Sequence, residues 1–204
     1  MTDWWQQLLQ DLANTQPLEI VAVIFAVAYV VLAARQSIWC WLCAIVSTAL
    51  YTVLYFKVAL LSNSLLNIYY LVIAVYGWYV WRGGADRSGS IPVRRWSWRQ
   101  HVVAIVITSA SVPILAWWTI KLGAKSPYID AATTCFAVLA TYMVARKILE
   151  NWLYWVVIDL VEIYVSGLRG LALTSLLFMI YVVMAVYGYQ QWLSSYRRTS
   201  QFNS

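Results

Sequence analysis

Long apolar runs dominate this sequence and leave few folds open to it. Runs of about 17–25 residues predict transmembrane helices, and seven occur, near residues 18–34, 38–56, 60–81, 100–120, 129–146, 150–168 and 170–193. The chain is 63% hydrophobic and only 11% charged, whereas a soluble domain usually carries about 25% charged residues. The sequence therefore predicts an all-α integral membrane protein with the lipid bilayer as its surroundings.

The basic residues lie in the loops between these runs and do not form one face, so nucleic acid is not an expected partner. With seven helices, ten of the fourteen Lys and Arg residues fall on the side that holds the C-terminus. The other side receives Lys57, Lys121, Lys125 and Arg169. The positive-inside rule then predicts an N-terminus outside the cell and a C-terminus in the cytoplasm.

Three segments fall outside the predicted spans. Residues 1–17 place Trp4, Trp5, Leu8 and Leu12 on one helical face, which predicts a short interfacial helix. Residues 82–99 form a long cytoplasmic loop, and residues 194–204 are expected to be a frayed, polar cytoplasmic tail.

The sequence also repeats itself without gaps at an offset of 111 residues. The repeat pairs Trp41 with Trp152, Gly77 with Gly188, and Trp81 with Trp192. Such fixed-period similarity indicates a duplication, with residues 18–81 as the first three-helix repeat and 129–193 as the second. The single helix at 100–120 joins them and makes them parallel, in a 3+1+3 arrangement. Transporters built this way bind substrate between the repeats, near the middle of the membrane.

The sixth predicted helix carries a polar and aromatic stripe. At 100° per residue, Trp152, Trp155, Asp159, Glu162 and Ser166 share an arc of about 80°. Carboxylates facing lipid cost several kcal/mol, so the stripe is expected to face the bundle interior. Two like charges one turn apart also leave open that one of them holds a proton.

The first repeat has Trp41, Ala44, Thr48 and Tyr51 at the corresponding places, so both acids are lost and a small residue replaces Trp155. We expect a cavity beside Trp155 that favours a flat organic cation. Ring faces and carboxylates attract cations, and the amide of Asn67 can form hydrogen bonds with polar substituents of a ligand. The alternative is that the tryptophans only pack between helices. The candidate binding residues are Trp152, Trp155, Asp159, Glu162, Asn67, Tyr70, Trp41 and Tyr181.

The motifs IWCW at 38–41, N-x-x-Y at 67–70 leading into YGWYVW, and ENWLYW at 150–155 together resemble the PnuC vitamin transporters. The resemblance covers about residues 20–192. It implies a SWEET-like fold in the bacterial inner membrane, a homotrimer, and ligand contacts at Asn67, Tyr70, Trp152 and Trp155. Family members import nicotinamide riboside, and relatives carry thiamine or riboflavin, with trapping by a cytoplasmic kinase.

The resemblance has one departure. Some nicotinamide riboside carriers place an amide where this chain has Asp159 and a small polar residue where it has Glu162. The two acids suit the pyridinium of nicotinamide riboside, and they suit the thiazolium of thiamine equally well. Nicotinamide riboside is therefore the expected substrate and thiamine the alternative.

Other functions fit the sequence less well. A retinal protein needs a lysine within the seventh span, which has none, and an enzyme needs a nucleophile–base pair or a metal site. Cys40 and Cys43 are read as small apolar residues and the single histidine, His101, as an interfacial side chain, so no cofactor or metal is expected. A binding subunit without transport of its own stays open as an alternative function.

No phosphate-binding loop is present in the sequence, which favours facilitated diffusion with metabolic trapping over ATP-driven transport. Proton coupling through Asp159 or Glu162 is the alternative.

Overall fold

The structure is a computed structural model that describes residues 17–57, 61–83, 91–121 and 126–202. Within these ranges, seven α-helices hold nearly all of the residues. They are α2 (Pro17–Ala34), α3 (Trp39–Lys57), α4 (Leu61–Gly83), α6 (Trp98–Lys121), α7 (Pro127–Ala145), α8 (Asn151–Leu168) and α9 (Ala172–Phe202). The predicted all-α fold of seven long helices is confirmed, and most helix ends lie within two or three residues of their predicted places.

The last helix is the main exception. α9 continues to Phe202, so the expectation of a frayed tail from residue 194 was wrong for the residues described. The polar residues there suit a helix that leaves the membrane, and the hydroxyls of Thr199 and Ser200 donate to carbonyls one turn earlier. At the other end, Pro17 opens α2, where its fixed φ suits the first helical turn. The interfacial helix predicted before it, and part of the 82–99 loop, lie outside the described residues.

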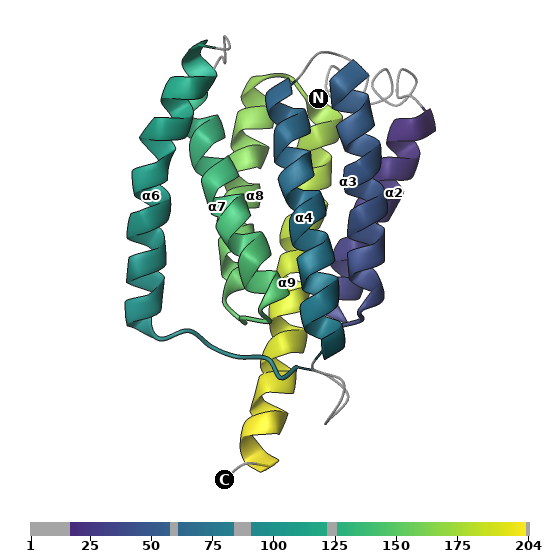
Figure 1. Ribbon diagram of the computed structural model, residues 1–204, viewed down its shortest axis with the longest axis vertical. Coiled ribbons are helices and arrows are strands. Elements are labelled where there is room, and N and C mark those ends of the chain that lie inside the picture. Colours follow the sequence, from purple (N-terminus) through teal and green to yellow (C-terminus); the bar gives the residue numbers. More distant parts are fainter. Residues whose placement is uncertain (1–16, 58–60, 84–90, 122–125, 203–204) are drawn as a thin grey trace.

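Six helices form a closed ring. α3 packs against α2 and α4, and α8 packs against α7 and α9; contacts of α2 with α9 and of α4 with α7 close the ring between the halves. α6 packs against α7 on the outside of the ring (Figure 1). The helices of the two halves correspond in order, α2 to α7, α3 to α8 and α4 to α9, and each has neighbours in the ring that correspond to those of its counterpart. This symmetry is consistent with the predicted 3+1+3 plan.

The repeat is visible in local backbone geometry as well. Gln36 and Lys147, which are 111 residues apart, both adopt left-handed conformations, with φ of 56° and 52°. In each turn the next amide bonds back into the ended helix: Ser37 N–H to Leu32 O at 2.9 Å and Ile148 N–H to Met143 O at 2.9 Å. This 6→1 bond is the mark of a Schellman helix end. Both halves therefore end their first helix in the same way.

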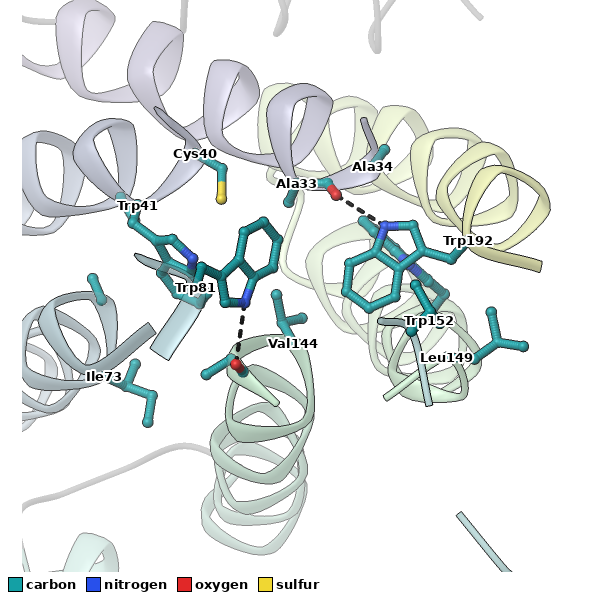
Figure 2. Packing of buried hydrophobic residues seen from close by; sticks show 14 of the residues in the cluster. Ala33, Ala34, Cys40, Trp41, Ile73, Trp81, Val144, Leu149, Trp152 and Trp192 are labelled. Carbon is teal, nitrogen blue, oxygen red and sulfur yellow. Dashed lines mark hydrogen bonds between the residues drawn. The ribbon is translucent and has the colours of Figure 1, made fainter. Parts of the chain in front are cut away.

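Two tryptophans tie the halves to each other. The Trp81 indole N–H donates to Ala145 O at 3.1 Å, and the Trp192 N–H donates to Ala33 O at 3.0 Å (Figure 2). In each case a tryptophan on the third helix of one half donates to a carbonyl in the last turn of the other half's first helix. The Ala33 carbonyl also accepts from Gln36 N–H at 2.9 Å. The ring is thus locked by two reciprocal bonds at the end where α2 and α7 finish.

The backbone before α6 pairs with the turn between α7 and α8. Arg94 N–H donates to Lys147 O at 2.9 Å, and Leu149 N–H donates to Arg94 O at 2.8 Å. This short bridge holds the start of the linker helix against the second half of the ring.

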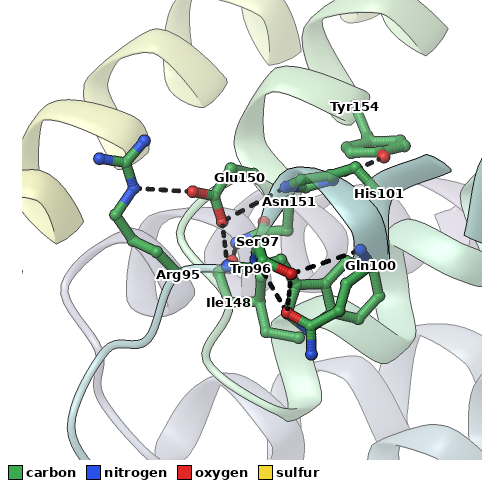
Figure 3. Close-up of polar contacts among 9 residues, drawn as sticks. All are labelled: Arg95, Trp96, Ser97, Gln100, His101, Ile148, Glu150, Asn151 and Tyr154. Carbon is green, nitrogen blue, oxygen red and sulfur yellow. Dashed lines mark hydrogen bonds and ion pairs between the residues drawn. The ribbon is translucent and has the colours of Figure 1, made fainter.

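Side chains strengthen the same junction (Figure 3). The Glu150 carboxylate accepts hydrogen bonds from Arg95 Nε at 2.9 Å and from Trp96 N–H at 3.2 Å. His101 Nδ1 lies 3.0 Å from the Tyr154 hydroxyl, and the two rings stack at 5.9 Å. His101 therefore fastens α6 to α8.

The outer surface of the ring is apolar. Large side chains exposed there include Ile24, Val72, Val157 and Val183, and Ile114 is exposed on α6. By length and composition alone, three helices of the described chain could cross a membrane: α6, α7 and α9. The other helices are shorter in their apolar part or carry polar residues that face inward. The apolar exterior and the long helices together indicate a multi-pass membrane protein.

Candidate functional site

The six-helix ring encloses a cavity of about 300 Å³. Both halves contribute to its wall, as expected for a site between repeats. Six of the eight predicted binding residues line it: Trp41, Tyr70, Trp152, Trp155, Asp159 and Tyr181. Ala44, the small residue at the place of Trp155 in the first half, lines it too.

Three residues of the α8 stripe, Trp152, Trp155 and Asp159, face this cavity. Trp152 and Asp159 are 3% exposed, whereas Leu153, Val157 and Leu160 on the other faces of the helix are 48–62% exposed. The 3.6-residue periodicity of the helix thus separates a polar inner face from a lipid-facing outer one.

Asp159 is the chemically distinctive group in the cavity. Its side chain is buried, and no described residue gives it a hydrogen bond or an ion pair. The aromatic residues Tyr70, Trp155 and Tyr181 share the same wall. A buried carboxylate is costly without a partner, and ring faces attract cations more strongly when water is excluded. This arrangement can therefore stabilise a flat cation.

Trp41 and Trp152 add two hydrogen-bond donors. Both indole N–H groups are buried, and neither finds an acceptor among the described residues. Each ring lies directly against a glycine of the neighbouring helix: a Cβ added to Gly77 would meet Trp41, and one added to Gly188 would meet Trp152. The glycines therefore allow α4 to pack closely against α3, and α9 against α8.

These two rings also belong to a layer of four tryptophans that closes one end of the cavity, called here the indole layer: Trp41, Trp81, Trp152 and Trp192. Ring centroids are 5.4 Å apart for Trp41 and Trp81, and 5.6 Å for Trp152 and Trp192. Trp81 and Trp192 connect the pairs at 6.3 Å. The layer lies at the end where α3 and α8 begin, and the cavity extends from it toward Tyr51 and Phe178.

Asn67 and Glu162, the two remaining predicted residues, are not on the cavity wall. Asn67 is buried one turn before Tyr70 on α4, and Glu162 is half-buried one turn after Asp159 on α8. Both residues therefore lie beyond the cavity wall, toward the end of the ring opposite the indole layer.

Sequence reasoning missed several lining residues, of which Tyr29 is the largest. Tyr29 lies on α2 with its ring centroid 6.0 Å from that of Trp41; its only signal in the sequence was being the one tyrosine in a mostly aliphatic helix. The hydroxyls of Ser47, Thr48 and Thr141 also line the cavity, and each donates to a backbone carbonyl at 2.7–2.9 Å. Their oxygens keep acceptor capacity toward the cavity.

The described residues contain no group of three or more His, Cys, Asp or Glu side chains that could hold a metal ion.

Comparison with known proteins gives a consistent result. Residues 16–194 match the model of the nicotinamide mononucleotide transporter family. The chain is 24% identical over 206 residues to the nicotinamide riboside transporter PnuC of Escherichia coli (strain K12), covering 88% of this chain and 86% of that protein. It is 26% identical over 196 residues to the riboflavin/roseoflavin transporter RibM of Streptomyces davaonensis, covering 90% and 87%. The fold matches a crystal structure of the vitamin B3 transporter PnuC with a TM-score of 0.76 and 20% identity, over 97% of this chain and 89% of that one.

Proposed function

The chain belongs to the nicotinamide mononucleotide transporter family, a family of membrane transporters and not of enzymes, and we propose that it imports nicotinamide riboside. The substrate would bind in the cavity between the two halves. Thiamine is the second candidate, because its thiazolium ring is also a flat cation.

The observation that carries this proposal is the buried Asp159 carboxylate without a hydrogen bond or ion pair from the described residues. A cationic ring beside it would supply the missing countercharge, while Trp155 and Tyr181 would contact the ring faces. The indole N–H groups of Trp41 and Trp152 would donate to hydroxyl or carboxamide oxygens of the substrate.

Charge and size also argue against the neutral flavin that the name of the RibM relative suggests. A flavin ring system offers Asp159 no positive charge. The cavity of about 300 Å³ is at the lower end of the range of roughly 300–1,000 Å³ for ligand pockets, which favours a small vitamin.

Transport then requires the indole layer to open. We place the N-terminus outside and the C-terminus in the cytoplasm, which puts the layer at the cytoplasmic end of the cavity. A substrate entering from outside would meet Asn67 and Glu162 before the cavity. Movement of the two halves against each other would part the four indoles and release it inward, with a kinase that phosphorylates the vitamin preventing its return.

The chain offers no means of using ATP, so facilitated diffusion is the simplest coupling, and proton exchange through Asp159 or Glu162 is the alternative. We further propose that the protein forms a homo-oligomer, with a trimer as the first state to test by light scattering of the purified protein.

Calorimetric titration of the detergent-purified protein with nicotinamide riboside, thiamine and riboflavin tests the substrate. Micromolar or tighter binding of nicotinamide riboside alone supports the proposal, and tight binding of thiamine alone would assign the protein to the second candidate. Preference for riboflavin would overturn the argument from the Asp159 charge.

A further inference from the structure

A second cavity, of about 640 Å³, lies outside the ring, between α6 and α7. We call it the linker groove. It does not share a lining residue with the transport cavity, although different residues of α7 line each of them. Its function is therefore separate from substrate binding.

The linker groove is basic at one end and apolar along its length. On α6, Arg99, Val103 and Ile107 follow one another at intervals of four residues and so share one face. On α7 and just beyond it, Leu139 and Arg146 are seven residues apart and also share a face. Both arginines lie where α6 begins and α7 ends, and the apolar side chains extend from there toward the middle of the bundle.

Neither arginine has a carboxylate partner among the described residues. Arg95 and Arg169 are ion-paired, at 2.9 Å and 2.8 Å. In contrast, Arg146 only donates to the Tyr76 hydroxyl at 3.3 Å, and Arg99 and Arg146 are both exposed. Two guanidinium groups at the head of an apolar groove form a site for an anion with a hydrophobic chain.

We propose that the linker groove binds an anionic phospholipid, with its phosphate at Arg99 and Arg146 and an acyl chain along Val103, Ile107 and Leu139. Basic pockets between transmembrane helices are suited to anionic headgroups. Trp96, which also lines the groove, fits the headgroup level, where tryptophan is enriched.

Charge favours a lipid over a second copy of the chain as the occupant. A second copy would need a carboxylate at the same membrane depth. Among the described residues, Glu150 is the one carboxylate at this end of the bundle, and it already pairs with Arg95. A phospholipid supplies both the negative charge and the apolar chain.

Binding of lipids to the delipidated, detergent-purified protein tests the proposal by native mass spectrometry, with phosphatidylglycerol and phosphatidylcholine as probes. We expect phosphatidylglycerol to bind about tenfold more tightly. The double variant Arg99→Gln, Arg146→Gln should lose this preference and keep its affinity for nicotinamide riboside or thiamine, whichever the unaltered protein binds. The matched control is Arg197→Gln, Arg198→Gln, which removes the same charge at the same end of the molecule but outside the groove.

A second variant tests the apolar part. Ile107 is 62% exposed, so Ile107→Trp should fill the groove without disturbing the core and should weaken phosphatidylglycerol binding about tenfold. Three results would overturn the proposal: equal binding of the two lipids, an equal loss in the control variant, or full competition by inorganic phosphate, which would make the site one for a soluble anion. A changed oligomeric state in Ile107→Trp with unchanged lipid binding would also overturn it, because the groove would then be a contact between copies.

Discussion

At the scale of single residues, the four tryptophans of the indole layer differ in the hydrogen bonds that their indole N–H groups form. The indole N–H groups of Trp81 and Trp192 donate to backbone carbonyls of the opposite half. Their neighbours Trp41 and Trp152 have the same burial but no acceptor among the described residues. The first pair holds the ring together, and we propose that the second pair recognises a ligand.

The charge of Asp159 should decide affinity for a cation. Asp159→Asn keeps the shape of the side chain and removes the charge, and an interaction with a charged partner is worth about 1.5–3 kcal/mol. We expect binding of the cationic vitamin to weaken roughly ten- to hundredfold. Calorimetric titration measures this, with Asp130→Asn as the control because Asp130 pairs with Arg169 away from the cavity.

The same variant carries a test of stability. Removing a buried charge that has no partner should leave the melting temperature of the ligand-free protein unchanged or higher. A lower melting temperature would mean that Asp159 has a structural partner, and equal affinities in both variants would contradict the binding argument.

Trp155 should contribute through its ring. It is half-buried, lines the cavity and is matched by Ala44 in the other half. Trp155→Ala should weaken substrate binding tenfold or more while the purified protein stays folded. Trp118→Ala on the outer face of α6, where the side chain is 58% exposed, is the control. Unchanged affinity in Trp155→Ala would exclude an aromatic contact.

Helical periodicity predicted the angular position of the candidate binding residues around α8 but not their depth along it. Trp152, Trp155 and Asp159 could be predicted because 100° per residue defines which face turns inward. Glu162 and Asn67 have suitable angles but lie one turn beyond the lining residues, since the cavity's length depends on which rings from other helices fill it. Tyr29 could not be predicted for the same reason: its place depends on contact with Trp41 across a helix pair.

At the scale of helices, the close approach of α4 to α3 and of α9 to α8 depends on glycine. A Cβ on Gly188 would lie 2.7 Å from the Trp152 ring, and one on Gly77 would overlap the Trp41 ring. Gly188→Ala should therefore lower the melting temperature, because overpacking a core costs about 1–3 kcal/mol.

Gly167→Ala is the matched control for that substitution. An added Cβ at Gly167 meets no atom within 4 Å, and alanine stabilises a helix by up to about 1 kcal/mol relative to glycine. Thermal unfolding in detergent should show opposite signs for the two variants. A stabilised Gly188→Ala would show that the indole can move aside.

The turn between α7 and α8 buries a lysine. Lys147 is 1% exposed with its Nζ 4.4 Å from the Trp81 ring centroid, and burial lowers its pKa to about 8 from an ordinary value of 10.5. At a pH between these two pKa values, the Lys147 amine is protonated in the unfolded chain and neutral in the folded chain. Stability contributed at this site should therefore rise as pH increases from about 8 toward 10.5.

Lys147→Met isolates this effect. The difference in melting temperature between the original protein and the variant should shift in favour of the original protein as pH rises through that window. Gln36→Met, at the repeat-related position with the same left-handed backbone, should change stability equally at every pH. A pH-independent difference for Lys147→Met would mean that the buried amine does not titrate in this range.

At the scale of the whole molecule, duplication could be predicted from the sequence and ring closure could not. An offset of 111 residues relates the halves, but apolar helix faces do not specify which neighbours they meet. The contacts of α2 with α9 and of α4 with α7 include the two indole–carbonyl bonds between the halves, and a lone Trp near a helix end does not identify its acceptor. The extension of α9 was missed because a polar composition excludes a residue from lipid without excluding it from a helix.

The coupling of transport can be decided on the whole molecule in sealed vesicles. A uniported cation gains about 2.3 kcal/mol per 100 mV of inside-negative potential, which corresponds to about fiftyfold accumulation at equilibrium. Proteoliposomes with a potassium-diffusion potential of that size should accumulate the labelled vitamin to this extent and lose it when the potential is collapsed. Exchange of the cation for one proton would be electroneutral, so accumulation would then follow an imposed pH gradient and ignore the potential. That second outcome would make Asp159 or Glu162 a proton carrier, and Asp159→Asn and Glu162→Gln, each tested at saturating substrate, would show which carboxylate the exchange requires.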